Sequence, residues 1–142
     1  MATVICFESA FGYQIRPLVR DGAQVIVVST NNRSYRRSAN SAQHVAIGQM
    51  RAAETGRPFV QSAISGITAV IDADGVVRQK TELFDRTVVQ TTVEATTGET
   101  PYVRYGEWAT VGSLAAVAVV LVLTGVDSVR RRRKTSLDSQ PL

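Results

Sequence analysis

The chain has few of the residue types that crosslink a fold or bind a metal. Its 142 residues include one cysteine, Cys6, and one histidine, His44. A single cysteine excludes an internal disulfide, and it does not identify the cellular compartment. Asp72 and Asp74 have no further ligand cluster beside them in the sequence, so they suit a turn better than a metal site. We therefore expect no metal and no cofactor.

Charge is absent from one long stretch late in the chain. Residues 108–126 contain no charged side chain and are mostly Leu, Val and Ala. Their length is close to the roughly 20 residues that span a bilayer as a helix. Residues 130–134 then hold five of the 16 basic residues, as is typical of the cytoplasmic flank of a membrane helix. The sequence therefore predicts a transmembrane helix at residues 106–128 and a basic cytoplasmic tail at residues 129–142.

Two other interpretations of this region are possible from its composition. A buried apolar C-terminal helix is opposed by the lack of a polar face along residues 111–124. A nucleic-acid patch is opposed by the rest of the chain, where 11 basic and 12 acidic residues nearly cancel, so we expect no nucleic-acid partner. The first residues lack the basic segment of a signal peptide. We therefore expect an upstream segment to carry residues 1–105 to the outer face of a cell membrane.

The apolar runs and turn residues of the first 105 residues predict an α/β fold. Two β-branched runs, residues 3–7 and 24–29, flank a short helical segment at residues 11–19, as in a βαβ unit of a parallel sheet. Further strands are predicted at residues 59–62, 66–71, 76–80 and 88–93, with a hairpin turn at residues 72–75.

A longer helix is predicted between the second and third strands. Ser41 is placed as its N-cap, and Gly56 follows its end. The loop before it, residues 31–40, follows a strand of the sheet, and such loops carry ligand contacts in open α/β sheets. The apolar residues at helical spacing, which predict the buried face, are Ala42, Val45, Ala46, Met50 and Ala53.

Cys6 lies at the end of the first apolar run, and Glu8 follows two positions later. A strand that delivers a lone cysteine to its carboxyl end is a way for an α/β enzyme to present a nucleophile. Such a cysteine needs a base and an oxyanion donor, and almost no chain precedes it to supply them. The alternative interpretation is an inert thiol, because free cysteine is often buried.

Five short segments follow one another in an informative order and spacing. They are residues 4–8 (Val-Ile-Cys-Phe-Glu), 21–32, 43–58, 65–75 and 100–102 (Thr-Pro-Tyr). Together they resemble the C-terminal part of the apolipoprotein N-acyltransferase family, which belongs to the nitrilase superfamily. The resemblance covers roughly residues 3–126, the predicted membrane helix included.

The resemblance implies a partial nitrilase-like αββα sandwich in residues 1–105, a carbon-nitrogen hydrolase domain on the outer face of the membrane. It implies transfer of a fatty acyl chain from a phospholipid, through a thioester on Cys6, to the N-terminal amine of a diacylglyceryl-cysteine apolipoprotein. The backbone N–H of Phe7 corresponds to the oxyanion donor. Glu8 corresponds to a second acid, to which we assign a supporting role in positioning the site.

The chain also departs from the family pattern. The family triad is Glu-Lys-Cys, and its Glu and Lys precede the Cys, whereas neither Lys80 nor Lys134 matches the family position. We therefore expect the chain to be inactive alone and to need the N-terminal part of the enzyme as a partner. The loop after Asn31 carries Arg33 and an Arg36-Arg37 pair in place of the usual residues, and these arginines are candidates for contact with phospholipid headgroups.

Three alternatives follow from these departures. The first is a nitrilase-superfamily enzyme that hydrolyses amides, which the membrane segment opposes. The second is a non-catalytic, membrane-anchored remnant that binds a partner or lipid. The third is a split enzyme in which a separate polypeptide supplies the rest of the sandwich. His44 could suggest a Cys-His pair, but the resemblance implies chemistry without histidine, so we expect a structural or surface role for it.

Overall fold

The computed structural model describes residues 1–138, with side chains through Gly125. The chain forms two compact units, Met1–Gly106 and a second unit that begins at Glu107. Of the predicted cytoplasmic tail, residues 139–142 lie outside the described residues. Each unit is described by itself below.

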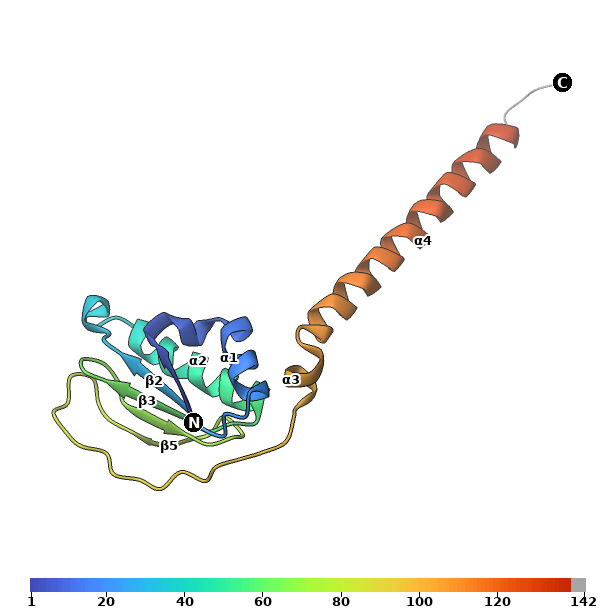
Figure 1. The fold of residues 1–142 in the computed structure, drawn as a ribbon. Helices are drawn as coiled ribbons and strands as arrows, with labels where there is room; N and C mark the ends of the chain where they lie inside the picture. Colours follow the sequence, from blue (N-terminus) through green and yellow to red (C-terminus); the bar gives the residue numbers. More distant parts are fainter. Residues whose placement is uncertain (139–142) are drawn as a thin grey trace. The chain divides into compact units, whose positions relative to one another are not determined.

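The first unit is built on a five-stranded mixed sheet with strand order β1-β2-β3-β4-β5 (Figure 1). Strands β1, β2 and β3 are parallel, and β4 and β5 continue the sheet as an antiparallel hairpin. This arrangement confirms the predicted α/β fold, the βαβ unit and the hairpin. The strand bounds are Ala2–Ile5, Ile26–Thr30, Phe59–Ala63, Ala69–Ile71 and Val77–Lys80.

Helices cover one face of this sheet, as Figure 1 shows for α1 (Gly12–Arg20) and α2 (Asn40–Thr55). The core between the helices and the sheet is built mainly of apolar side chains, and their burial is the main source of folding free energy in such a layer. A short helix, α3 (Pro101–Tyr105), adds Val103 to this core. The largest fully buried apolar side chains are Ile15, Ile26, Val28, Phe59, Ile71 and Val103.

The opposite face of the sheet is covered only in part. Val27, Val60 and Val70 lie in register across β2, β3 and β4 and point away from the helices, because neighbouring residues in a strand alternate between faces. Val70 is buried, whereas Val27 and Val60 are half-buried. A hollow of about 510 Å³ lies here, lined by Pro58, Val70, Thr92 and Thr96 among others. The face therefore has the apolar character of a surface that another layer covers.

Three details differ from the sequence-based expectation. Helix α2 begins at Asn40, so the buried Ser41 lies inside the helix and is not its N-cap. The buried face of α2 consists of Ser41, His44, Val45, Gly48, Arg51, Ala52 and Thr55; of the predicted apolar face only Val45 is buried.

Residues 88–93 form no strand. Their Val and Thr residues have the right propensity, but β-propensity reflects packing against a neighbouring strand. In the structure β5 ends the sheet, and residues 91–94 line the hollow beside β4 instead of pairing with an edge. The prediction of a strand at residues 88–93 was therefore wrong.

The second unit contains one long helix, α4 (Trp108–Asp138). Its segment Trp108–Gly125 has a mean hydropathy of 2.0, and none of that segment is buried within the protein. By length and composition it can cross a membrane. The exposed side chains of this segment include Leu114, Val117, Val120, Leu121 and Leu123.

Candidate active site

The three parallel strands end at one edge of the sheet, and the candidate residues follow them there. Cys6 follows β1, Asn31 follows β2 and Ser65 lies just after β3. The register places Ile5 beside Ser29, and Ser29 beside Ser62. Loops at this edge of an open α/β sheet are the usual place for a ligand site.

Cys6 occupies a sharp turn between β1 and the 3-10 helix η1 (Cys6–Ala10). Its φ is +49°, in the left-handed region that side chains other than glycine rarely adopt. The residue is half-buried, so the thiol lies at the surface of the fold and not in the apolar core. A strained residue with a positive φ at the end of a strand is typical of a nucleophile elbow.

The two residues after Cys6 lie on the outer side of this turn. The Oε2 atom of Glu8 accepts a hydrogen bond from the backbone N–H of Ile5 at 2.7 Å, so Glu8 joins the residues on either side of Cys6. Phe7 is 53% exposed. Its ring packs edge-on against Phe11 at 5.5 Å, and Phe11 in turn contacts Tyr13. An exposed aromatic cluster therefore adjoins the Cys6 turn.

A buried polar network lies beneath the turn. His44, on α2, is 2% exposed, and Ser9, on η1, is 1% exposed. The Nε2 atom of His44 lies 3.0 Å from Ser9 Oγ and 3.2 Å from the carbonyl oxygen of Cys6. The Ser9 hydroxyl donates to the same carbonyl at 2.9 Å. Thus α2 contacts the backbone of the candidate nucleophile through one side chain.

The other ring nitrogen of His44 connects the network to β2. Its Nδ1 lies 3.3 Å from Asn32 Oδ1, which also accepts from the Thr30 hydroxyl at 2.9 Å. Burial lowers the pKa of His44, and the hydrogen bond to the Cys6 carbonyl opposes this effect in part. The imidazole is therefore neutral at physiological pH.

The loop after β2 is anchored at its base and charged at its tip. Asn31 Oδ1 accepts from the Ser65 hydroxyl at 2.5 Å and from the N–H of Arg33 at 3.2 Å. The guanidinium groups of Arg33, Arg36 and Arg37 are exposed. Among the described residues, none of them has a carboxylate within ion-pair distance, and Arg37 lies over the Phe84 ring at 5.9 Å.

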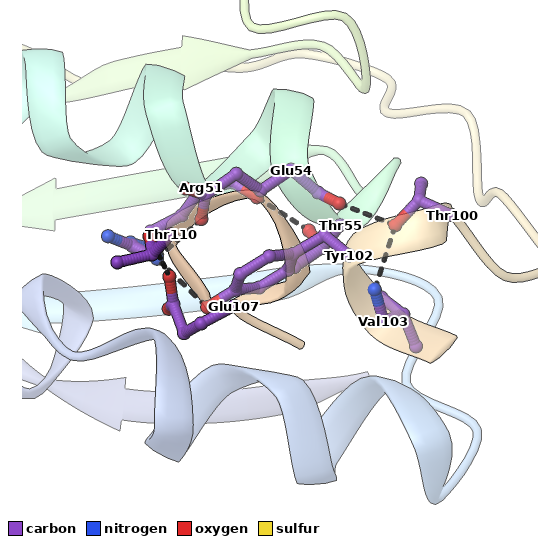
Figure 2. Close-up of polar contacts among 8 residues, drawn as sticks. All are labelled: Arg51, Glu54, Thr55, Thr100, Tyr102, Val103, Glu107 and Thr110. Carbon is purple, nitrogen blue, oxygen red and sulfur yellow. Dashed lines mark hydrogen bonds and ion pairs between the residues drawn. The ribbon is translucent and has the colours of Figure 1, made fainter. Parts of the chain in front are cut away.

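The far end of α2 holds a second polar network, shown in Figure 2. Arg51 pairs with Glu54, and its Nη1 donates to the Tyr102 hydroxyl at 3.4 Å. Thr100 caps α3 by accepting from the N–H of Val103 at 3.1 Å, and its own hydroxyl donates to the Glu54 carbonyl at 2.5 Å. These contacts fix α3 to α2.

Arg57 is the other charged residue at this end, and it also has a structural role. Its side chain is buried and donates to the carbonyl oxygens of Ala23 at 2.9 Å, Gly56 at 3.0 Å and Gly98 at 2.5 Å. Burial lowers the pKa of its guanidinium, and the three carbonyl oxygens compensate for the lost hydration.

Comparison with known proteins places this geometry in a family. The family model of carbon-nitrogen hydrolases matches residues 1–102. The chain belongs to the carbon-nitrogen hydrolase family. The match spans the whole sheet, the Cys6 turn and the network beneath it, so the strand-end cysteine of this chain lies inside the matched domain.

Similar curated proteins narrow the comparison within the carbon-nitrogen hydrolases. The chain is 32% identical to the apolipoprotein N-acyltransferase of Photobacterium profundum over 100% of its own length and 27% of that protein. It is 38% identical to that of Geobacter metallireducens over 82% of its own length, and 33% identical to that of Nitrosomonas europaea over 95%. These matches confirm the resemblance described above. The chain spans about a quarter of the length of these relatives.

The position of Lys80 decides whether the first unit of this carbon-nitrogen hydrolase chain places a lysine beside Cys6. Lys80 ends β5, and the strand order puts three strands and therefore four inter-strand spacings between β1 and β5, a separation of about 19 Å at about 4.8 Å per spacing. Lys80 is also exposed. Within the described residues of the first unit, no lysine therefore lies beside Cys6.

The structure brings together more residues around Cys6 than sequence reasoning predicted. Cys6, Phe7 and Glu8 lie on one turn, where the sequence placed them, and their roles remain predictions. Ser9, His44 and Asn32 were missed as neighbours of the candidate nucleophile. The expectation for His44 was a structural or surface role; its side chain is buried and contacts the Cys6 carbonyl. One feature of the sequence could have indicated this contact. His44 lies one turn into the helix whose preceding loop is at the same end of the sheet as Cys6.

Proposed function

We propose that this chain carries the nucleophile of a membrane N-acyltransferase, with Cys6 as the acyl carrier. The observation that supports this most is the strained Cys6 at the carboxyl end of β1, inside a matched carbon-nitrogen hydrolase domain. The relatives named apolipoprotein N-acyltransferase support an apolipoprotein as the acyl acceptor, and we propose a phospholipid as the acyl donor.

The reaction has two steps. The Sγ atom of Cys6 attacks the ester carbonyl carbon of the donor, a C–S bond forms, and the ester C–O bond breaks to release a lysophospholipid alcohol that takes the thiol proton. The amine of the acceptor then attacks the thioester, a C–N bond forms, and the C–S bond breaks; the proton lost from the amine passes to the departing sulfur and restores the Cys6 thiol. The N–H of Phe7 donates to the oxyanion in both steps.

In this proposal, the base and the lysine of the reaction come from outside residues 1–106. Lys80 lies too far across the sheet, and Glu8 is directed to the N–H of Ile5. The partly covered sheet face, with Val27 and Val60 half-buried, fits the second sheet of a nitrilase-like sandwich. We assign to that second half of the domain the Glu and Lys of the family triad.

Two surfaces beside Cys6 suit a phospholipid. The aromatic cluster of Phe7, Phe11 and Tyr13 offers exposed apolar area to an acyl chain. The guanidinium groups of Arg33 and its neighbours offer hydrogen-bond donors to a phosphate. An amide-hydrolysing enzyme needs neither surface, although the same family match would also fit it.

Helix α4 supports a membrane location. We propose that Trp108–Gly125 crosses the cell membrane, that residues 1–105 lie on the outer face, and that the C-terminus is cytoplasmic. Because Cys6 is the only cysteine, a membrane-impermeant maleimide reports its side of the membrane. Labelling of Cys6 in intact spheroplasts is the expected result, and labelling only after lysis would contradict the topology.

The direct test is detection of the thioester. Native membranes that carry the chain are supplied with a phospholipid bearing an alkyne-tagged acyl chain. We expect a tag on Cys6 that neutral hydroxylamine removes, and its complete loss in Cys6→Ala. An untagged chain, or equal tagging of Cys6→Ala, would refute the acyl-carrier role. Release of ammonia from amides without any tag would favour the hydrolase, and a Cys6→Ala variant without a phenotype would favour the remnant.

A further inference from the structure

We propose that His44 is a positioning residue for the candidate nucleophile: its Nε2–H holds the carbonyl oxygen of Cys6 and thereby orients the N–H of Phe7. The inference rests on the proposed function, in which that N–H binds the oxyanion. It assigns to a buried histidine on α2 a role in the reaction without direct contact with the substrate.

The geometry of the peptide group connects the two atoms. The carbonyl oxygen of Cys6 and the N–H of Phe7 belong to one planar trans peptide, in which they point in opposite directions. A hydrogen bond that fixes the carbonyl therefore fixes the direction of the N–H. Two donors hold this carbonyl, the Ser9 hydroxyl at 2.9 Å and His44 Nε2 at 3.2 Å.

The hydrogen positions follow from the same contacts. The Ser9 hydroxyl gives its hydrogen to the Cys6 carbonyl, so Nε2 has to carry a hydrogen to bond with either oxygen. In neutral His44, Nδ1 is then an acceptor and needs a donor opposite it. Asn32 lies there, and among the described residues its Nδ2 has no partner. Turning the Asn32 amide by 180° puts Nδ2 opposite Nδ1 and the Thr30 hydroxyl oxygen, so that Nδ2 can donate to both.

The turn needs such a hold because its backbone is strained. Cys6 has a φ of +49°, a conformation that persists only where the surroundings hold it. On the outer side, Glu8 accepts a hydrogen bond from the N–H of Ile5 and Phe7 contacts Phe11, but these contacts act on the residues around Cys6 and not on its carbonyl. Ser9 and His44 are the buried groups in contact with the Cys6 carbonyl. Neither ring nitrogen has Sγ as a hydrogen-bond partner in the described structure, so His44 acts on the backbone and not as the base.

Two substitutions at this position form a matched pair. In His44→Gln the side-chain amide nitrogen occupies the place of Nε2 and can still donate to the Cys6 carbonyl. In His44→Asn the amide nitrogen reaches only the place of Nδ1, so the bond to Cys6 is lost while the contact with Asn32 is kept. Both variants remove the imidazole, so a difference between them reports the bond to Cys6.

The first readout needs no enzymatic activity. Because the chain has one cysteine and one histidine, [1-¹³C]cysteine labels a single carbonyl and [¹⁵N]histidine a single ring. In the full chain in lipid bilayers we expect nitrogen shifts of the neutral Nε2–H tautomer. The Cys6 carbonyl resonance should move upfield in His44→Asn and stay near its wild-type position in His44→Gln. An unchanged resonance in His44→Asn, or the Nδ1–H tautomer, would overturn the proposal.

The second readout separates positioning from folding. We expect His44→Asn to slow thioester formation on Cys6 by about 10²-fold, the typical loss on removal of one oxyanion donor, and His44→Gln to restore most of the rate. Alkylation of Cys6 by iodoacetamide needs no oxyanion donor and should stay within about threefold of wild type. If both rates fall together, the role is structural only and the proposal fails. If the carbonyl resonance responds but the wild-type chain forms no thioester in the native membranes that supply the rest of the domain, the proposed function has failed and the bond is a structural contact.

Discussion

The two ends of α2 perform different tasks with different chemistry. Near its start, His44 joins a network of neutral groups that holds the strained Cys6 turn. Near its end, Arg51 and Glu54 form an ion pair and bind α3. A neutral network fixes hydrogen positions and directions, whereas a partly buried ion pair mainly fixes the packing of one segment on another. One helix therefore connects the candidate site to the closing segment of the domain.

The largest effect that separates the two ends is expected for Arg51→Met. Methionine keeps the apolar stem of Arg51 but removes its bonds to Glu54 and Tyr102. The free energy of unfolding of the full chain should fall by about 2 kcal/mol, the typical loss for a charge-assisted hydrogen bond in a partly buried site. Urea-dependent pulse proteolysis in detergent micelles measures it.

The control for Arg51→Met is Arg20→Met, which changes an exposed arginine at the end of α1. It should cost less than about 0.5 kcal/mol. At the same time, the iodoacetamide reactivity of Cys6 in folded Arg51→Met should match wild type. An Arg51 variant with altered Cys6 reactivity and normal stability would break the distinction between the two ends.

A smaller effect is expected from pH, and only at the first end. Burial lowers the pKa of His44 in the folded chain, so below a pH of about 6.5 the unfolded chain binds a proton that the folded chain excludes. Stability is therefore complete above that pH and falls as the pH is lowered, by at most about 1.4 kcal/mol per pH unit. The fall ends once the pH passes below the native pKa.

The measurement for this prediction is the free energy of unfolding between pH 7.5 and 5.5. Cys6 and Glu8 are the titratable groups on the turn against His44, and both remain in His44→Gln. That variant should lose most of the pH dependence in this window, whereas Arg51→Met should keep it. An equal slope in wild type and His44→Gln would assign the pH dependence to other groups.

The smallest effect is expected in the loop before α2. Replacing Arg33, Arg36 and Arg37 by Gln removes exposed charges without carboxylate partners in the described residues, so stability should change by less than about 0.5 kcal/mol. Acyl transfer from an anionic phospholipid should fall by about threefold, and the loss should shrink at high salt. Transfer from a zwitterionic phospholipid should change less. Equal losses with both donors would exclude a headgroup contact.

Local patterns in the sequence predicted much of this fold. The β-branched runs predicted β1 and β2 to within about two residues. The sequence from Asp72 to Gly75 predicted the hairpin turn, in which the Asp72 carboxylate accepts from the N–H groups of Asp74 and Val76. The unbroken apolar stretch predicted the long exposed helix. Such features depend on the chemistry of neighbouring residues, which the sequence states directly.

The sequence did not reveal the contacts between residues that lie far apart in the chain. The sequence by itself determined that a lone cysteine ends a strand, that glycine and proline stop α2, and that Trp108–Gly125 can span a membrane. The tertiary structure decided which face of α2 is buried, why residues 88–93 have no strand partner, and that His44 lies under Cys6. These outcomes depend on which segments meet in space, and each contact joins residues whose separation in the chain carries no local signal.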